Sequence, residues 1–178
     1  MLGLVFTELI EMVEDRFSPE VADRMLEAVE DQGGGVYTAV GSYPHEQVGA
    51  MVARLAEITG VPADDLVRAF GRHLLTRFAS SHPAPFVRHP DVFDFLASID
   101  TDIHVQVRKL YAAATPPRFQ VLERDARTLR LQYLSPRRME SLALGLMEQL
   151  GEHLGQPLHI EVEPGDGPTV FRIHKVAA

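Results

Sequence analysis

The sequence predicts an α+β fold, with a helical lobe in its first two thirds and a lobe built around an antiparallel sheet in its last third. Before Pro116, apolar residues recur at spacings of three and four, which is the period of an amphipathic helix. From Pro116 onward they alternate in short runs, as they do in strands. Glycine and proline separate the runs. We expect one domain, because 178 residues can bury one sizeable core.

Four helices are expected in the first part of the chain. Each carries an apolar stripe, over residues 5–13, 21–29, 48–58 and 66–78. The second begins at Ser18-Pro19, since serine caps helix N-termini and proline suits the first helical position. Glycines at 33–35 end the second helix, Gly60 ends the third, and Gly71 interrupts the fourth.

A loop and two shorter helices follow. The proline-rich residues 80–90 are predicted to form the loop. Residues 92–99 have the spacing of a fifth helix. Asp100 and Asp102 are expected to cap a sixth helix, whose broad apolar face carries His104.

The last third is predicted to contain two hairpins and one helix. Apolar residues alternate over 119–121 and again over 129–133, across a turn. Ser135-Pro136 is expected to begin a helix that Gly155 ends. Two more strands are expected at 158–162 and 171–173, with a turn at 164–167 between them.

The composition excludes several classes of protein. The chain has no cysteine, which rules out disulfides and thiolate ligation, so any metal must be bound by histidine or carboxylate. A net charge of -8 with dispersed basic residues argues against a nucleic-acid partner. No apolar run is long enough for a bilayer, and the N-terminus lacks the basic region of a secretory signal. We therefore expect a cytoplasmic protein without membrane spans.

Two sets of residues have the chemistry of a cofactor site. An imidazole on an apolar helix face, as at His104, can present Nε2 to a metal, although a histidine there is more often a core or capping residue. Tyr133, Ser135 and Arg137 place two hydroxyls and a guanidinium where a strand passes into a helix, a donor set suited to carboxylates. The alternative is that Ser135 is only a helix cap and Arg137 is only solvated.

Five segments of the chain resemble the haem nitric oxide/oxygen-binding family (H-NOX, also called HNOB), over almost the whole length. MLGLVFTELIEMVEDRF resembles the family's first helix, and GSYPHEQVGAMVARLAEITGVPADDLVRAFGRHL resembles the next helices. DIHVQVRKLY resembles the proximal-ligand segment, ATPPRF the stretch after it, and YLSPRR the Tyr-x-Ser-x-Arg motif. The order of the segments also agrees, and this combination is specific.

The resemblance implies a single H-NOX domain over residues 1–178, with a distal helical lobe at about 1–62, a proximal α+β lobe at about 63–178 and a haem b between them. It also implies roles for individual residues. His104 is expected to be the axial ligand of the iron, and Tyr133, Ser135 and Arg137 are expected to bind the haem propionates. Pro117 is expected to press on the porphyrin, unless it only sets an extended backbone. Gly71 matches a glycine that allows motion in the family, unless it only permits close helix packing.

The distal pocket indicates which gas is bound. Family members that hold oxygen carry a tyrosine and other polar side chains there, whereas this chain has Leu142, Leu74 and Leu9 at the matching positions. The other pocket-wall residues are also apolar: Val5, Phe78 and Leu146. Bound dioxygen carries partial negative charge and needs a hydrogen-bond donor, whereas nitric oxide binds ferrous iron strongly without one. Nitric oxide rather than oxygen is therefore the expected ligand, with carbon monoxide as a second one. The same leucines can equally be ordinary core residues.

The implied function is gas sensing without catalysis. Nitric oxide is expected to weaken or break the bond between the iron and His104, and the resulting change of shape is expected to signal. Because the chain ends soon after the domain, the partner is expected to be a separate bacterial protein, a histidine kinase or a cyclic-di-GMP enzyme. Two alternatives remain. One is a small-molecule-binding or scaffold domain of the same fold without haem, and the other is a haem peroxidase, which the absence of a distal His–Arg pair disfavours.

Overall fold

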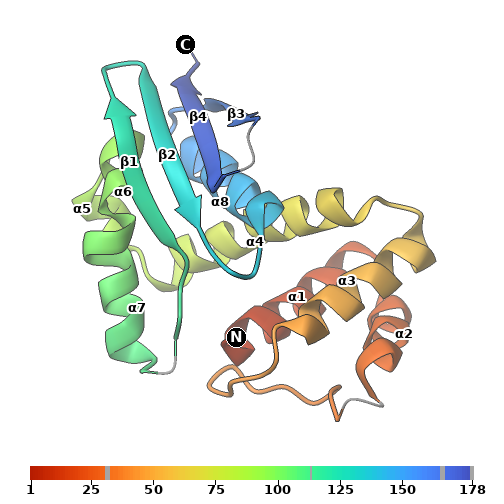
Figure 1. The fold of residues 1–178 in the computed structure, drawn as a ribbon. Coiled ribbons are helices and arrows are strands. Elements are labelled where there is room, and N and C mark those ends of the chain that lie inside the picture. The colour runs from red at the N-terminus through yellow and green to blue at the C-terminus, as the bar shows by residue number, and fades with distance from the viewer. Residues whose placement is uncertain (31–32, 113, 165–166, 177–178) are drawn as a thin grey trace. The chain divides into compact units, whose positions relative to one another are not determined.

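The structure, a computed structural model, describes residues 1–30, 33–112, 114–164 and 167–176. Helices occupy the chain as far as Leu110, and strands appear only after it, so the predicted α+β class is confirmed (Figure 1). Two compact units make up the chain, Met1–Phe70 and Gly71–Ala178. No helix in the described ranges is both long and apolar enough to cross a membrane.

The first unit consists of helices. They are α1 (Gly3–Arg16), α2 (Pro19–Glu30), α3 (Glu46–Thr59) and the beginning of α4 (Ala63–Ser81). Residues of the predicted apolar stripes lie in its core, where Leu9, Met12 and Met51 are at most 1% exposed. Gly60 ends α3 in the left-handed region with φ 71°, as its position predicted.

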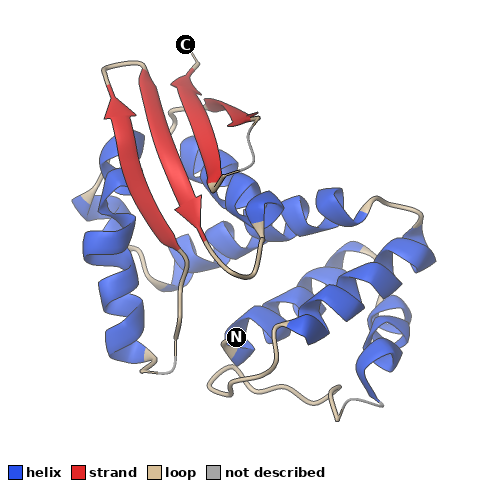
Figure 2. Cartoon of the chain, in the orientation of Figure 1, coloured by secondary structure: helices blue, strands red, loops and turns tan. Residues whose placement is uncertain are grey.

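The second unit is built on a four-stranded antiparallel sheet in the order β1-β2-β4-β3 (Figure 2). The strands are β1 (Arg118–Arg124), β2 (Thr128–Leu134), β3 (Leu158–Glu163) and β4 (Thr169–Lys175). Both predicted hairpins are present, although Gly165 and Asp166 of the second turn lie outside the described residues. The register sets Phe119 opposite Tyr133.

One face of the sheet packs against helices and forms part of the hydrophobic core of this unit. Its fully buried side chains include Leu131 and Phe171, which pack in one cluster with Phe93 of α6 (Val92–Ser98) and Met147 of α8 (Glu140–His153). The opposite face is charged: Glu163 accepts hydrogen bonds from the guanidinium groups of Arg130 and Arg172.

Two predicted boundaries in the middle of the chain were wrong. Residues 80–90 are not all loop, because α4 continues to Ser81 and a short helix, α5 (Ala84–Arg88), follows. Pro83 and Pro85 lie in the N-cap and first turn of α5, where the missing backbone N–H removes no helical hydrogen bond. Asp100 and Asp102 cap no helix, because a π-helical turn, η1 (Ile99–Ile103), joins α6 directly to α7 (His104–Leu110).

The predicted start of α8 was also wrong. The helix begins at Glu140 and not at Ser135-Pro136, because Arg138 has φ 48°, which a helix cannot include. The Ser135 hydroxyl instead accepts a hydrogen bond from the Arg137 backbone amide at 3.2 Å, which stabilises a turn.

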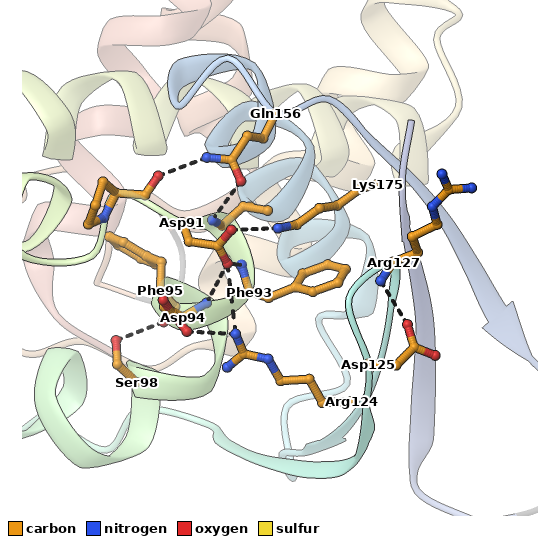
Figure 3. A network of polar contacts seen from close by, with 12 residues as sticks. Asp91, Phe93, Asp94, Phe95, Ser98, Arg124, Asp125, Arg127, Gln156 and Lys175 are labelled. Carbon is orange, nitrogen blue, oxygen red and sulfur yellow. Dashed lines mark hydrogen bonds and ion pairs between the residues drawn. The ribbon is translucent and has the colours of Figure 1, made fainter. Parts of the chain in front are cut away.

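The segment from α6 to α7 is anchored at its beginning (Figure 3). The Asp91 carboxylate caps α6 by accepting from the backbone amides of Phe93 and Asp94, and it is also paired with Lys175 of β4. Gln156 accepts from the Val92 amide. Lys175 of β4 and Gln156, which follows α8, therefore hold the start of the segment that carries His104.

Candidate functional site

His104 is the first residue of α7, directly after the π-helical turn, and its side chain is 14% exposed. Its Nδ1 lies 3.2 Å from Oδ1 of Asp100, four residues earlier on the same face of the helical segment. When Nδ1–H donates to this carboxylate, Nε2 is left with a free lone pair. The arrangement therefore orients the ring and chooses which nitrogen can bind a metal.

Burial lowers the pKa of His104, and the hydrogen bond to Asp100 opposes this effect only in part. The ring is consequently neutral near pH 7, which is the form that ligates metals. Within the residues that the structure describes, no three His, Asp or Glu side chains are placed to bind a bare metal ion. A porphyrin, however, brings four nitrogens of its own, so one imidazole is enough to bind a haem iron.

Two residues after α7 lie against His104. The Pro117 backbone carbonyl accepts a hydrogen bond from the imidazole, which raises the pKa of His104 in part. The ring of Phe119 lies 6.1 Å from that of His104 and 5.3 Å from that of Tyr133, measured between centroids. The structure thus brings His104, Pro117, Phe119 and Tyr133 close together, and we call these four residues the proximal cluster.

Tyr133 and Ser135 lie together at the end of β2. Tyr133 is 4% exposed, and burial raises the pKa of its phenol, while hydrogen bonds with the Ser135 side chain and the Met139 backbone lower it in part. An open depression of about 370 Å³ is lined by both residues and by Arg138. These hydroxyls and the Arg138 guanidinium are donors that suit a carboxylate, but Glu140 also lines the depression, and Arg137 is not among its described lining residues.

Arg137 reaches the segment between α7 and β1. Its guanidinium donates through one terminal nitrogen to the Thr115 carbonyl at 2.6 Å and through the other to the Thr115 hydroxyl. Since Thr115 precedes Pro117 by two residues, Arg137 links the predicted propionate motif to the segment that follows His104.

The predicted apolar wall residues fall in both units. Leu74 and Phe78 lie on α4, and Leu142 and Leu146 lie on α8. These two helices touch at Gly71, where an added Cβ would be 2.3 Å from the Leu142 carbonyl oxygen and 2.9 Å from the Leu146 amide nitrogen. The close-packing explanation of Gly71 therefore has a geometric basis.

The remaining two wall residues, Val5 and Leu9, belong to α1 in the first unit. Leu9 is 1% exposed, and Val5 is half-buried.

Sequence reasoning missed three residues around this site. Asp100 was interpreted as a cap, although its spacing of four from His104 is the spacing of helical neighbours. Phe119 was assigned only to a strand pattern, and its position opposite Tyr133 follows from the hairpin register. Thr115 had no signal in the sequence, because its contact with Arg137 joins residues 22 apart.

The family comparison and the comparison with solved structures lead to the same family. The haem-NO-binding (HNOB) family model matches residues 2–162. An unliganded Fe(II) H-NOX protein from K. algicida is 34% identical, with a TM-score of 0.92 over 100% of this chain and 98% of that one. An H-NOX from Shewanella woodyi, solved with IWP-051 in the Fe(II)CO state, is 38% identical, with a TM-score of 0.85 over 99% and 95%. An S. oneidensis H-NOX in the Fe(II)NO state is 27% identical, with a TM-score of 0.90 over 99% and 100%. A comparison with curated proteins found no match.

Proposed function

Because the chain belongs to the haem-NO-binding (H-NOX) family, we propose that it is a haem-based sensor of nitric oxide that signals to a partner protein without catalysis. The observation that carries this proposal is His104, a neutral and largely buried imidazole whose Nδ1 is held by Asp100 so that Nε2 can bind iron. The family binds haem, and haem b is the form proposed here.

The residues of the second unit fit such a cofactor. His104 supplies one axial nitrogen, and Pro117 lies beside it. Tyr133, Ser135 and Arg137 supply two hydroxyls and one full positive charge for the propionates, although Arg137 must exchange its contacts with Thr115 for them. A bound haem supplies the ferrous iron to which the gas binds.

The residues that the sequence assigns to the distal wall support nitric oxide as the ligand. Leu9, Leu74 and Leu142 carry no hydrogen-bond donor, and a buried partial charge without a donor costs free energy. Dioxygen needs such a donor and nitric oxide does not, so the protein should discriminate against oxygen. Carbon monoxide should also bind. The Shewanella woodyi relative was solved in the Fe(II)CO state, and the S. oneidensis relative in the Fe(II)NO state.

Release of His104 is the proposed switch. A gas that weakens the bond between His104 and the iron frees α7, and η1 adjoins α7 directly. Such a ligand favours one of two conformations through a difference in binding free energy. A bacterial histidine kinase or cyclic-di-GMP enzyme in the cytoplasm is the proposed receiver.

The test is haem binding by the wild type and by His104→Gly. We expect the purified wild type to bind haem with a Soret band at one haem per chain, the variant to bind haem weakly, and added imidazole to restore the band. An unchanged spectrum in His104→Gly would remove His104 as the ligand. No Soret band in the wild type, even after haem is added, would favour a domain of the same fold that works without haem.

A further inference from the structure

We propose that Asp100 sets the strength of the bond between His104 and the haem iron, and thereby how readily nitric oxide releases His104. The inference rests on the proposed function and names a positioning residue that acts through the ligand.

Among the described residues, the geometry pairs Asp100 strongly with the His104 imidazole and only weakly with one further side chain. Its Oδ1 lies 3.2 Å from Nδ1 of His104, and both side chains are largely buried, at 25% and 14% exposed. Its Oδ2 lies 3.8 Å from Nε of Arg118, whose side chain is 82% exposed. The ion pair between Asp100 and Arg118 is therefore weak, because an exposed pair is solvated and screened by salt. Asp100 therefore interacts mainly with His104.

A carboxylate that accepts from Nδ1–H makes the other ring nitrogen more basic. Nε2 then donates more strongly to iron, and more free energy is needed to separate the two. A neutral acceptor in the same place gives a weaker effect, because hydrogen bonds to charged groups are about twice as strong as neutral ones. The charge of Asp100, and not only its shape, is thus the controlling feature.

The π-helical turn places Asp100 on the side of His104, while Asp102 of the same turn has other partners. The Asp102 carboxylate pairs with the Arg88 guanidinium and with Nε2 of His89 at 3.0 Å. The two carboxylates are two residues apart in the sequence, yet only the first contacts the proposed ligand. Asp102 is therefore a matched control.

The experiment measures the iron–histidine stretching frequency of the reduced, haem-loaded protein by resonance Raman spectroscopy. Asp100→Asn keeps the shape and an acceptor oxygen but removes the charge. We expect a lower frequency, release of His104 at lower nitric oxide concentration, and haem affinity lower by about tenfold, the small end of the range for partners of metal ligands. Asp102→Asn should leave the frequency unchanged.

Two results would overturn the proposal while the haem site stands. One is an unchanged iron–histidine frequency in Asp100→Asn. The other is an equal decrease in both variants, which would mean that the loss of any negative charge in this turn lowers the frequency. A wild type without a Soret band is a different result and would count against the proposed function itself.

A second measurement covers the case in which Asp100→Asn does not fold. In His104→Gly, the cavity is filled either with imidazole, whose free N–H can donate to Asp100, or with 1-methylimidazole, which has no N–H. The iron–ligand frequency should differ more between the imidazole and 1-methylimidazole complexes of this variant than between the same two complexes of free haem in detergent micelles. Equal differences in protein and micelles would overturn the role of Asp100.

Discussion

Arg137 can donate either to Thr115 or to a propionate of the proposed haem. In the structure its terminal nitrogens donate to the carbonyl and hydroxyl of Thr115, which are neutral acceptors. A haem propionate is charged and can accept two parallel bonds from one guanidinium, so it is the stronger acceptor. Haem binding should therefore move Arg137 away from Thr115.

Arg137→Ala should lose more haem than Ser135→Ala. A hydrogen bond to a charged group contributes about 2 kcal/mol and a neutral one about 1 kcal/mol. The haem dissociation constant should then rise by about thirtyfold in the first variant and about fivefold in the second. Competition for haem with apomyoglobin measures both values. Equal retention in the two variants would contradict a charged propionate contact at Arg137.

The charged face of the sheet predicts a response to acid. Hydrogen bonds from Arg130 lower the pKa of Glu163 from its ordinary value of 4.5 to about 2, and Arg172 adds to the effect. A carboxyl whose pKa is depressed by folding stabilises the native state above its unfolded pKa. This contribution is lost as the pH falls from about 4.5 to about 2.

Glu163→Gln should remove this part of the acid sensitivity. The thermal midpoint of the variant should lie below that of the wild type at pH 7, and the gap should narrow as the pH falls below 4.5. Added salt should narrow the gap as well, because the cluster is partly open to solvent, with side chains 21% to 47% exposed. A gap that stays constant down to pH 2 would show that the Arg130–Glu163 pair does not stabilise the fold through its charge.

At the residue level, the sequence identified the types of side chain but not all of their contacts. His104, Tyr133 and Ser135 were candidates by their chemistry, and the resemblance of the segments around them gave them their expected roles. The Asp100–His104 contact was open to prediction from helical spacing, but a capping interpretation obscured it. Contacts that depend on chain reversal, such as Arg137 with Thr115, follow only from the folded backbone.

Elements with a strong period were predicted well, and their boundaries less well. The apolar stripes of α1, α3 and α4 and the hairpin of β1 and β2 all appear where expected. The π-helical turn η1 could not be predicted, because aspartates in a short polar stretch read equally well as caps. The start of α8 was predicted too early, because nothing in the sequence indicates that Arg138 adopts a positive φ.

The contact between α4 and α8 leads to a prediction about Gly71. A methyl group there would meet backbone atoms of α8, which cannot move aside as a flexible side chain can. Gly71→Ala should therefore lower the free energy of unfolding by about 1–3 kcal/mol in urea denaturation.

Gly49→Ala is the control for this prediction, because Gly49 is also inside a helix and has nothing within 4 Å of an added Cβ. It should raise stability by about 0.5–1 kcal/mol, the ordinary gain from replacing a helical glycine. Equal gains in the two variants would show that α8 moves aside at no cost.

At the scale of the whole molecule, the resemblance of ordered segments carried more information than any single motif. His104 alone, or the Tyr-x-Ser-x-Arg spacing alone, fits ordinary core and cap roles. Their order along the chain, with the helices before them, indicated the H-NOX family, which the family model and the solved relatives confirm. Composition and periodicity by themselves led only as far as the α+β class.

The most direct test of the central claim is one absorption experiment on the reduced, haem-loaded wild type, exposed first to air and then to nitric oxide. We expect air to give no stable oxygen complex, because Leu9, Leu74 and Leu142 offer no donor. Nitric oxide should then give the spectrum of an iron that has lost His104. A stable oxygen complex would contradict the assignment of nitric oxide as the ligand, and a nitric oxide complex that keeps His104 at room temperature would contradict release of His104 as the switch.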